Sequence, residues 1–383
     1  MSNENDEYGG NGNPSGTDRP QSVAGGAMSQ RARPKGRHPL LEQVTRLYLV
    51  HAHSPIHVGV GEGLGNINLP IIREVHTDYP FIPGSSIKGI LRDAAEQGGL
   101  SRREIFSAFG PPKEHAGDAR GGLVISDGSL LCLPVRSLLG TFAWTTCPLI
   151  LKRLEQDARE AGLEVSGILS AKIWFSRPTP YLVTRASVLV NDKNERSGHL
   201  FIEDAMVPRT DQAGKTVWDT SMALDALAAW IADKLWPGDE DQKRFFVERL
   251  LLVPDEVFNY FHRYATEVRS RVKIDPERGT AANSGSWNEE YLPAETVLFG
   301  VAIGRTTVYI DRDTAKASSG GDRAEGAADQ PGGMTPATEP RTESRDPNDV
   351  LATLSTLLQG DPLLRVGGKS TGGSGRIHVR IVE

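Results

Sequence analysis

The stretch IPGSSIKGILR, at residues 82–92, contains the beginning of the clearest helix that the sequence predicts. A glycine and two serines open it, and such small or polar residues are favoured at helix N-termini. Apolar residues then recur at the spacing of one helix face: Ile87, Ile90, Leu91, Ala94 and Ala95. Glycines at positions 98 and 99 are typical of a helix end. The stretch therefore predicts a helix whose single apolar face must be covered by another layer.

Strand-like segments near both ends of the chain offer that layer. Residues 43–53 are rich in Val, Leu and Tyr and end at a Ser-Pro pair, which disfavours further ladder pairing. Residues 376–383 alternate, so that Ile377, Val379 and Ile381 face one way. We place both segments in one antiparallel sheet with the helix against it. The expected class is α+β, a sandwich of ferredoxin-like type.

Other periodic segments predict the rest of the secondary structure. Further strands are predicted at residues 123–133, 168–175, 182–190 and 297–310. Further helices are predicted at residues 101–109, 221–236, 241–253, 255–269 and 349–358. The helix at 221–236 carries a stripe typical of a core-facing helix: Leu224, Leu227, Ile231 and Leu235.

Two stretches contain almost nothing that burial would stabilise. Residues 1–39 hold few apolar side chains, and residues 311–349 hold no Val, Ile, Leu or aromatic residue. This composition predicts a disordered tail and a disordered, exposed acidic insertion. The folding part is then residues 40–310, with helical and hairpin insertions, and residues 350–383, which supply a helix, a glycine-rich loop and the closing strand. The two ends of the insertion should lie close together, since loop-closure entropy grows slowly with length.

The overall charge limits the kinds of partner. The 383 residues carry a formal net charge of −6 at pH 7, which excludes a globally basic nucleic-acid binder. Any polyanion must be held by local patches or backbone dipoles. Cys132 and Cys147 have no partners at metal-ligand spacing, which fits a reduced compartment. Without a long apolar run or an apolar N-terminus, we expect a cytoplasmic protein with no membrane partner.

One glycine-rich segment, VGVGEGLG at residues 58–65, invites comparison with the dinucleotide-binding fingerprint. The fingerprint fails because Leu64 or Asn66 stands where its third glycine is required. Pro70 also blocks the helix that should follow at once. A dinucleotide site is therefore not expected here.

A second glycine-rich segment, GGKSTGGSG at residues 367–375, directly precedes the terminal strand. It fails as a P-loop, because Leu363 stands where the first glycine is required. Its glycines can nevertheless bring backbone N–H groups close to an anion, with Lys369 and several hydroxyls beside them. A flexible hairpin connection explains the same composition equally simply.

The beginning of the helix near Ser86 suggests another anion site. Unpaired N–H groups and the positive end of the helix dipole gather there, beside the hydroxyls of Ser85 and Ser86. Lys88 and Arg92 are four residues apart and share one helix face. They can reach a ligand that lies along the sheet. A solvated helix flank is the alternative.

Two further clusters each allow two interpretations. His51 and His53 alternate on one predicted strand face and can bind a metal, but they lack a Cys or an acid at ligand spacing, so we interpret them as structural. The segment WNEEY at residues 287–291 mixes aromatic and acidic residues. It is either a projecting hairpin that stacks on bases or a packed segment.

Taken in order, these motifs resemble one family. They are SPIHVG at 54–59, GLGNINLPIIRE at 63–74, IPGSSIKGILR at 82–92, PVRS at 134–137, NEEYLP at 288–293 and the terminal glycine loop. The set is similar to the RAMP superfamily of CRISPR proteins, and within it to the backbone subunits, the fourth Cmr proteins, of type III-B effector complexes. The resemblance runs from residue 47 to the C-terminus and is interrupted by the acidic insertion.

The resemblance implies a modified RNA-recognition-motif fold with inserted subdomains and a thumb hairpin. It further implies an antiviral ribonucleoprotein in which copies stack head to tail along a guide CRISPR RNA, contact other type III effector subunits, and present the guide to target RNA. The residues that it assigns to RNA binding are Ser85, Ser86, Lys88, Arg92, Arg136, Gly368, Lys369 and Gly373. Those assigned to the thumb, which wedges into the guide–target duplex, are Trp287, Glu289 and Tyr291.

One position departs from the family pattern. Members that cut target RNA typically carry an aspartate where this chain has Asn68, whose amide is a poor base and a weaker metal ligand than a carboxylate. We therefore expect a non-catalytic RNA scaffold with no intrinsic cofactor and no metal site. The alternative is an endoribonuclease that uses Mg²⁺ and a displaced acid, Glu62, Glu74 or Asp78, so the candidate catalytic residues are His57, Glu62 and Asn68. A small-molecule phosphate-binding enzyme is a third hypothesis, outside the family.

Overall fold

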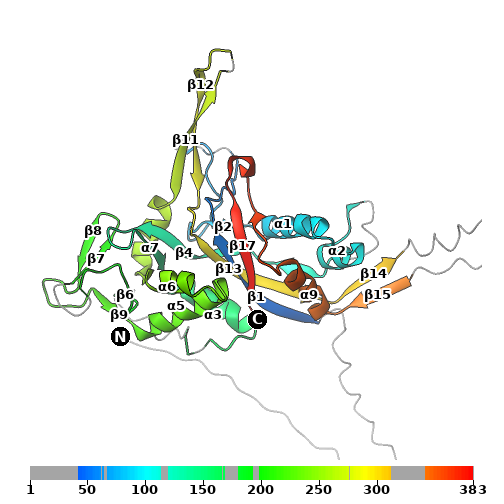
Figure 1. The fold of residues 1–383 in the computed structure, drawn as a ribbon, viewed down its shortest axis with the longest axis horizontal. Helices are drawn as coiled ribbons and strands as arrows, with labels where there is room; N and C mark the ends of the chain where they lie inside the picture. The colour runs from blue at the N-terminus through cyan, green and yellow to red at the C-terminus, as the bar shows by residue number, and fades with distance from the viewer. Residues whose placement is uncertain are drawn as a thin grey trace, which may run out of the picture. The chain divides into compact units, whose positions relative to one another are not determined.

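The computed structural model describes residues 42–61, 63, 67–113, 120–165, 167–168, 180–192, 198–275, 277–311 and 341–382 (Figure 1). The tail predicted at residues 1–39 lies outside the described residues, as do residues 312–340 of the predicted insertion. The described residues all belong to one compact unit, His38–Glu383.

Strands and helices alternate irregularly along this unit. The strands are β1 (Gln43–Ala52), β2 (Phe81–Ile82), β3 (Leu123–Ile125), β4 (Gly128–Arg136), β5 (Phe142–Thr146), β6 (Tyr181–Val183), β7 (His199–Ile202), β8 (Ala205–Pro208), β9 (Trp218–Thr220), β10 (Leu250–Leu252), β11 (Glu267–Ile274), β12 (Ala281–Tyr291), β13 (Val297–Arg305), β14 (Thr307–Asp311), β15 (Arg341–Arg345), β16 (Leu364–Arg365) and β17 (Arg376–Val382). The helices are α1 (Gly84–Gln97), α2 (Arg102–Phe109), α3 (Pro148–Glu160), α5 (Met222–Leu235), α6 (Glu240–Val247), α7 (Asp255–Tyr264), α9 (Pro347–Leu357) and the short 3-10 turn η3 (Ser370–Gly372).

An 11-stranded sheet organises these elements, in the order β16-β17-β1-β13-β4-β5-β10-β6-β9, with β2 beside β4 and β3 beside β13. β1 pairs antiparallel with β17 on one side and with β13 on the other. The first and last strands are therefore neighbours, as the sequence predicts, and the α+β class is confirmed. At the centre Tyr48 lies opposite Gly300, where any side chain would strike the Tyr48 hydroxyl.

The predicted apolar helix faces are buried as expected. α1 buries Ile87, Leu91 and Ala95. Gly84 opens that helix against the backbone of Ser126, an approach that leaves no room for a Cβ atom. The stripe of α5 is also buried, and burying each such Leu or Ile side chain stabilises the fold by about 1.5–3 kcal/mol.

Three antiparallel pairs of strands lie outside the main sheet: β7–β8, β11–β12 and β14–β15 (Figure 1). β11 and β12 form a long ribbon that stands away from the sheet, and β14 pairs with β15. Asp311 lies opposite Arg341, so the chain leaves and returns at paired positions of β14 and β15. The insertion was predicted too long, because Arg341–Arg345 form β15 and α9 begins at Pro347.

Several predicted elements have different bounds in the structure. The strand expected at 123–133 is divided into β3 and β4 around Asp127, whose carboxylate accepts a hydrogen bond from the Gly84 N–H at 2.8 Å. The strand expected at 182–190 is wrong beyond Val183, because Thr184 donates its hydroxyl to the Val247 carbonyl and the chain turns. Residues 169–175 lie outside the described residues.

Two predicted helices end early because strands follow them. The helix expected at 241–253 ends at Val247, and β10 then pairs parallel with β5 in the sheet. The helix expected at 255–269 ends at Tyr264, where β11 and the long hairpin begin. A short apolar run does not distinguish a helix end from a buried strand, so only the tertiary pairing decides.

Candidate nucleic-acid interface

The loop that contains Asn68 is held against the foot of the β11–β12 hairpin. The Asn68 side-chain oxygen accepts a hydrogen bond from the Asn288 N–H at 2.8 Å, across 220 positions of sequence. The Leu69 N–H donates to the Asn288 carbonyl, and the Glu290 N–H donates to the Leu69 carbonyl, each at 3.0 Å. The GLGNINLPIIRE and NEEYLP motifs therefore form one continuous backbone junction.

A buried ion pair fixes the next part of the same loop. Arg73 Nη2 lies 2.5 Å from Glu290 Oε1, and the Glu290 side chain is only 3% exposed. The same carboxylate accepts the Ile71 N–H at 3.1 Å and the Thr266 hydroxyl at 3.0 Å. Because both oxygens are satisfied, the pair avoids the desolvation penalty of an unpaired buried charge. The Arg of IIRE and the second Glu of EEY thus hold the loop to the hairpin.

His262 completes this buried cluster. Its Nδ1 lies 3.3 Å from Arg73 Nη1, so the imidazole nitrogen must accept the hydrogen bond. Burial, and then the positive charge of Arg73, lower the pKa of His262 to about 4. The ring is therefore neutral near pH 7, which is the form that tolerates a guanidinium neighbour.

Glu289, the neighbour of Glu290 on β12, anchors the other side of the junction. Its carboxylate accepts hydrogen bonds from Trp287 Nε1 at 2.7 Å and from the Tyr291 hydroxyl at 2.5 Å. It also pairs with Lys369 Nζ at 2.8 Å and with Arg271 Nε at 3.2 Å. Burial alone would raise the pKa of Glu289, but these donors outweigh it and hold the pKa at about 2. A carboxylate this acidic is a structural anchor and a poor general base.

A cavity of about 370 Å³ opens beside this cluster, lined by Gly63, Asn68, Leu69, Trp287 and Lys369. Three regions of sequence therefore meet in one place: the GLGNINLP loop, the foot of the hairpin and the terminal glycine loop. The Asn68 oxygen is already engaged, so this residue presents its NH₂ group, while the Lys369 ammonium pairs with Glu289 and is exposed at the cavity. Among these lining residues none carries a carboxylate. The cavity thus offers donors that suit phosphate and ribose oxygens.

His57 lies buried behind the same junction. Its Nδ1 is 2.7 Å from the Glu290 carbonyl, and because a carbonyl only accepts, Nδ1 carries the proton. A side chain at position 59 would strike the imidazole ring, so Gly59 is required for close packing. The Gly368 N–H donates to the His57 carbonyl at 2.8 Å. His57 therefore joins the glycine loop to β12, through its own carbonyl on one side and its imidazole on the other.

The terminal glycine loop adopts the conformations that its composition predicts. Gly367 and Gly373 have φ of +81° and +86°, values that favour glycine. Gly367 packs against the His57 carbonyl so closely that a side chain has no room. The N–H groups of Gly368 and Gly373 are used inside the fold, with Gly373 donating to Ser370 at 3.1 Å. Lys369 is exposed on the loop and points to Glu289 at the cavity.

A carboxylate of the protein itself, that of Asp127, already lies at the N-terminus of α1. The Asp127 carboxylate accepts the Gly84 N–H, which is one of the donors expected to face a phosphate. Ser85 is exposed and Ser86 half-buried, and Pro83 rather than a serine occupies the N-cap. The two hydroxyls remain candidates for RNA contact, but Asp127 weakens the positive end of the helix dipole at this point.

Lys88 and Arg92 diverge in the structure. Lys88 Nζ donates to the Leu123 carbonyl at 2.6 Å, and burial, followed by the charge of Arg92, lowers its pKa. Arg92 pairs with Glu96 at 3.0 Å along the same helix. Neither residue lines the cavity beside Asn68. Their roles in RNA binding stay predictions.

Arg136 is paired with two acids in the turn between β7 and β8. Its Nη2 lies 3.0 Å from Glu203 and 3.1 Å from Asp204. The Arg136 side chain is 67% exposed, so these pairs are weak and a phosphate can compete for the guanidinium. Its role in RNA binding stays a prediction.

The acids considered as replacements for an aspartate at position 68 have other partners. Glu74 pairs with Arg153 at 3.0 Å, and Asp78 lies 3.2 Å from Arg263. Glu62 lies outside the described residues. Within the part of the chain that the structure describes, no group of three His, Cys, Asp or Glu side chains is arranged to hold a metal ion.

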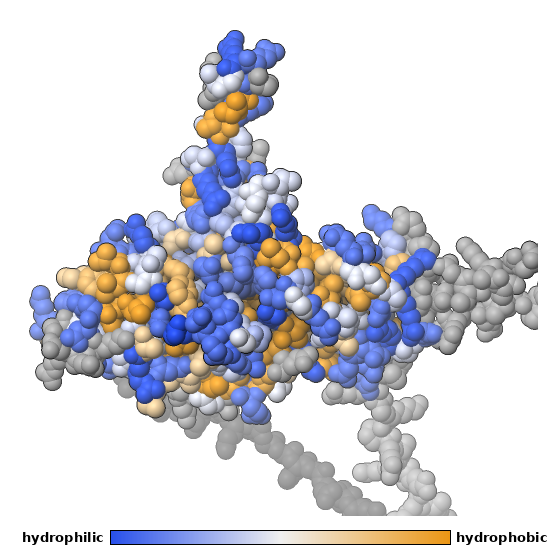
Figure 2. Space-filling model, viewed as in Figure 1, coloured by the Kyte–Doolittle hydropathy of each residue, from blue (hydrophilic) through white to orange (hydrophobic). Residues whose placement is uncertain are grey.

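The β11–β12 hairpin carries the residues predicted for a thumb at its foot. Glu289 and Tyr291 are buried there, and Trp287 is half-buried, so the two buried side chains are anchors of the hairpin. The exposed apolar side chains belong to β11: Val268, Val272 and Ile274. Figure 2 shows an apolar patch on this hairpin between hydrophilic residues.

Sequence interpretation missed several residues of the junction. Arg73 and Glu290 belong to the motifs, but the sequence predicts no role for either of them. Arg271 lies just beyond the helix predicted at residues 255–269. Their charges could have indicated a pair, because one motif contains an Arg, another contains adjacent glutamates, and buried charges in a protein are usually paired. Which acid meets which cation depends on the sheet register, so it follows only from the fold.

Comparison with known proteins agrees with this geometry. The sequence profile of the RAMP superfamily matches residues 49–378. The chain is 30% identical over 263 residues to the CRISPR system Cmr endoribonuclease Cmr4 of Pyrococcus furiosus, covering 67% of this chain and 81% of that protein.

Solved structures share the fold. The crystal structure of oligomeric Cmr4 from Pyrococcus furiosus matches with a TM-score of 0.53 and 21% identity, covering 88% of this chain and 97% of that one. A chain of the type III-B Cmr-beta complex bound to cognate target RNA, seen by cryo-EM, matches with a TM-score of 0.58 and 18% identity, covering 88% and 96%. The modified RNA-recognition-motif fold, the profile match and the curated relative together place this chain in the RAMP superfamily, as a member of the Cmr4 family of type III-B CRISPR proteins.

Proposed function

We propose that this chain is the backbone subunit of a type III-B CRISPR ribonucleoprotein, working in the cytoplasm in antiviral defence. Several copies bind one guide CRISPR RNA, contact the other effector subunits and present the guide for pairing with target RNA. Among the helices of the described chain, none has the length and apolar character needed to span a bilayer.

The convergence of three separate motifs on one donor-lined cavity is the observation that carries this proposal. Gly63, Asn68 and Lys369 line it together with Trp287 at the foot of the hairpin. An ammonium group, an amide and a glycine-lined turn bind ribose and phosphate oxygens without reading bases. Pyrococcus furiosus Cmr4, the relative described above, is named an endoribonuclease, and oligomers of that protein have been crystallised.

We further propose that the subunit serves as a scaffold and leaves target RNA uncut. General-base catalysis needs a group that accepts a proton, and an amide at position 68 does not. Its oxygen is also occupied by the Asn288 N–H. Glu289, the buried carboxylate of the junction, has a pKa of about 2 and four donors around it.

A metal-dependent endoribonuclease is the second candidate, and one feature favours it. Glu62 adjoins Gly63, which lines the cavity, so this acid is close in sequence to the position where a base would act. In that case a divalent cation such as Mg²⁺ would be the cofactor, and Glu62 the displaced acid.

Incubating the reconstituted complex with end-labelled complementary RNA and Mg²⁺ separates the two candidates. The scaffold proposal predicts intact target with the parent chain and regularly spaced fragments with Asn68→Asp, which restores the family carboxylate. Asn68→Ala is the matched control and should give no fragments. Regular fragments from the parent chain that disappear in Glu62→Ala would defeat the scaffold proposal and support the second candidate.

A further inference from the structure

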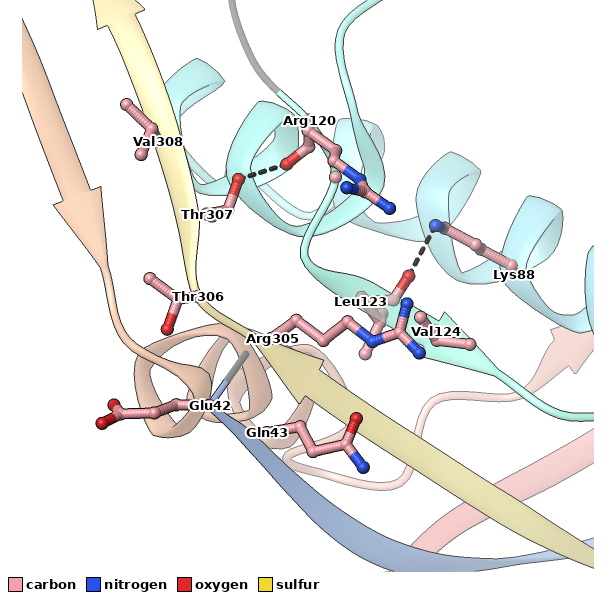
Figure 3. Close-up of a pocket in the computed structure, with 11 residues that line it drawn as sticks. Glu42, Gln43, Lys88, Arg120, Leu123, Val124, Arg305, Thr306, Thr307 and Val308 are labelled. Atoms are coloured by element: carbon pink, nitrogen blue, oxygen red, sulfur yellow. Dashed lines mark hydrogen bonds between the residues drawn. The ribbon is translucent and has the colours of Figure 1, made fainter. Parts of the chain in front are cut away.

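A second cavity, of about 660 Å³, lies at the other end of β1 (Figure 3). It is lined by Glu42 and Gln43 at the beginning of β1, by Arg305 at the end of β13 and by residues at the beginning of β3. The opposite end of β1 leads to His57 and the glycine loop. β1 has 10 residues, so the two ends are separated by about 30 Å, at roughly 3.3 Å per residue. This cavity is therefore distinct from the junction beside Asn68.

Three cations gather at this cavity: Lys88, Arg120 and Arg305. Figure 3 shows their charged groups on one side of it, with the carboxylate of Glu42 directed away. Arg120 and Arg305 are exposed, and neither has an ion-pair partner among the residues that the structure describes. Unpaired guanidinium groups in a concave site are available for bidentate contact with an anion.

The backbone that carries both arginines is held by direct hydrogen bonds. The Arg305 N–H donates to the Gly122 carbonyl at 2.9 Å, and the Gly122 N–H donates to the Ser107 carbonyl at 2.7 Å. The Thr307 hydroxyl donates to the Arg120 carbonyl (Figure 3). The two guanidinium groups are thus presented from elements that are fixed to each other. Presentation from fixed elements lowers the entropy cost of binding.

The chemistry of the lining selects phosphate groups over bases. No aromatic ring is among the residues that line this cavity, so a base finds no stacking partner there. Arginine favours phosphate because its planar donors match two phosphate oxygens. Lys88 adds a third cation, half-buried and already oriented by the Leu123 carbonyl.

We propose that Arg120, Arg305 and Lys88 form a second phosphate-binding site that takes the backbone of a ribose-phosphate strand, away from the junction at Asn68. The inference rests on the proposed RNA-binding function, and it gives one subunit two separate contacts with RNA. The contact is independent of base sequence.

The double variant Arg120→Gln/Arg305→Gln tests the site in the full chain after bound RNA has been removed. Binding of a labelled single-stranded RNA is measured by fluorescence anisotropy over a series of salt concentrations. Losing two phosphate contacts should weaken binding by about tenfold near 0.1 M salt and reduce the slope of log K against log salt by about 1.4. The control Lys215→Gln/Lys234→Gln removes the same charge from another surface and should leave the slope unchanged.

The outcomes separate this inference from the function on which it rests. A parent chain that binds no RNA defeats the proposed function itself. A parent that binds RNA, with Arg120→Gln/Arg305→Gln indistinguishable from the control, overturns only the second RNA contact. Calorimetric titration with inorganic tripolyphosphate distinguishes the source of the phosphate. Tripolyphosphate binding that the double variant abolishes, without any change in RNA affinity, would support a phosphate site but assign it to a soluble phosphate chain instead of a strand.

Discussion

The cavity beside Asn68 and the cavity at the far end of β1 differ in how their charges are paired. At the junction beside Asn68, Arg73 pairs with Glu290 and Lys369 pairs with Glu289, so most charges are neutralised within the protein. At the far end of β1, Arg120 and Arg305 are exposed, with no ionic partner among the described residues. The charged motif residues at the junction therefore hold the fold together, whereas Arg120 and Arg305, which lie outside the motifs, are available to a ligand. Motif membership alone does not identify the group that touches RNA.

Breaking the buried pair at the junction should give the largest effect on stability. Glu290→Ala leaves the half-buried Arg73 without its ionic partner, and we expect a loss of about 3–5 kcal/mol in the free energy of unfolding. Glu96→Ala, which removes an exposed partner of Arg92, should cost less than about 1 kcal/mol. Urea denaturation of both variants measures the difference. Equal small losses would show that the junction charges are not structurally important.

The second largest effect is expected on the pH dependence of stability, through the Glu289 carboxylate. Its folded-state pKa of about 2 lies below the ordinary value of 4.5, so the ionised form stabilises the fold above that pH, and the contribution is lost as the pH falls toward 2. Glu289→Gln should lower stability by about 2 kcal/mol near pH 6, because hydrogen bonds to a charged group are lost. The two proteins should converge as the pH falls toward 2. A constant difference across this range would argue against an ionised carboxylate at this position.

The smallest effect is expected on RNA binding, from Lys369 in the terminal glycine loop. Lys369→Ala removes one ammonium group and should reduce the salt slope of RNA binding by about 0.7, the contribution of a single phosphate contact. The affinity should fall by a few-fold. Lys215→Ala is the matched control, since Lys215 lies in the turn between β8 and β9. An unchanged slope for Lys369→Ala would place the phosphate elsewhere.

Sequence predicted the local features that depend on one segment. The apolar faces of α1 and α5 and the alternation of β17 follow from the periodicity of apolar residues. The positive φ at Gly367 agrees with the glycine-rich composition of its loop. The pairing of the first and last strands was also predicted, because one segment is rich in Val, Leu and Tyr, the other alternates, and both need a partner. The resemblance to the RAMP family then supplied the function.

Features that depend on tertiary pairing were not predictable. The predicted helix at 255–269 overlaps the first three residues of β11, and no strand is predicted for the rest, although Val268, Val272 and Ile274 lie on one face of the strand that pairs with β12. Lys88 was expected to reach a ligand beside Arg92, yet its ammonium donates to the Leu123 carbonyl on β3. Helical spacing gives the face on which a residue lies, but the neighbouring strand decides what that face meets.

Native mass spectrometry of the purified assembly with its RNA retained tests the central claim most directly. If this chain grips guide RNA through its cavities and serves as the repeating backbone, several copies should be found on one RNA molecule. A monomer free of RNA, and indifferent to added oligoribonucleotide at low ionic strength, would contradict that account.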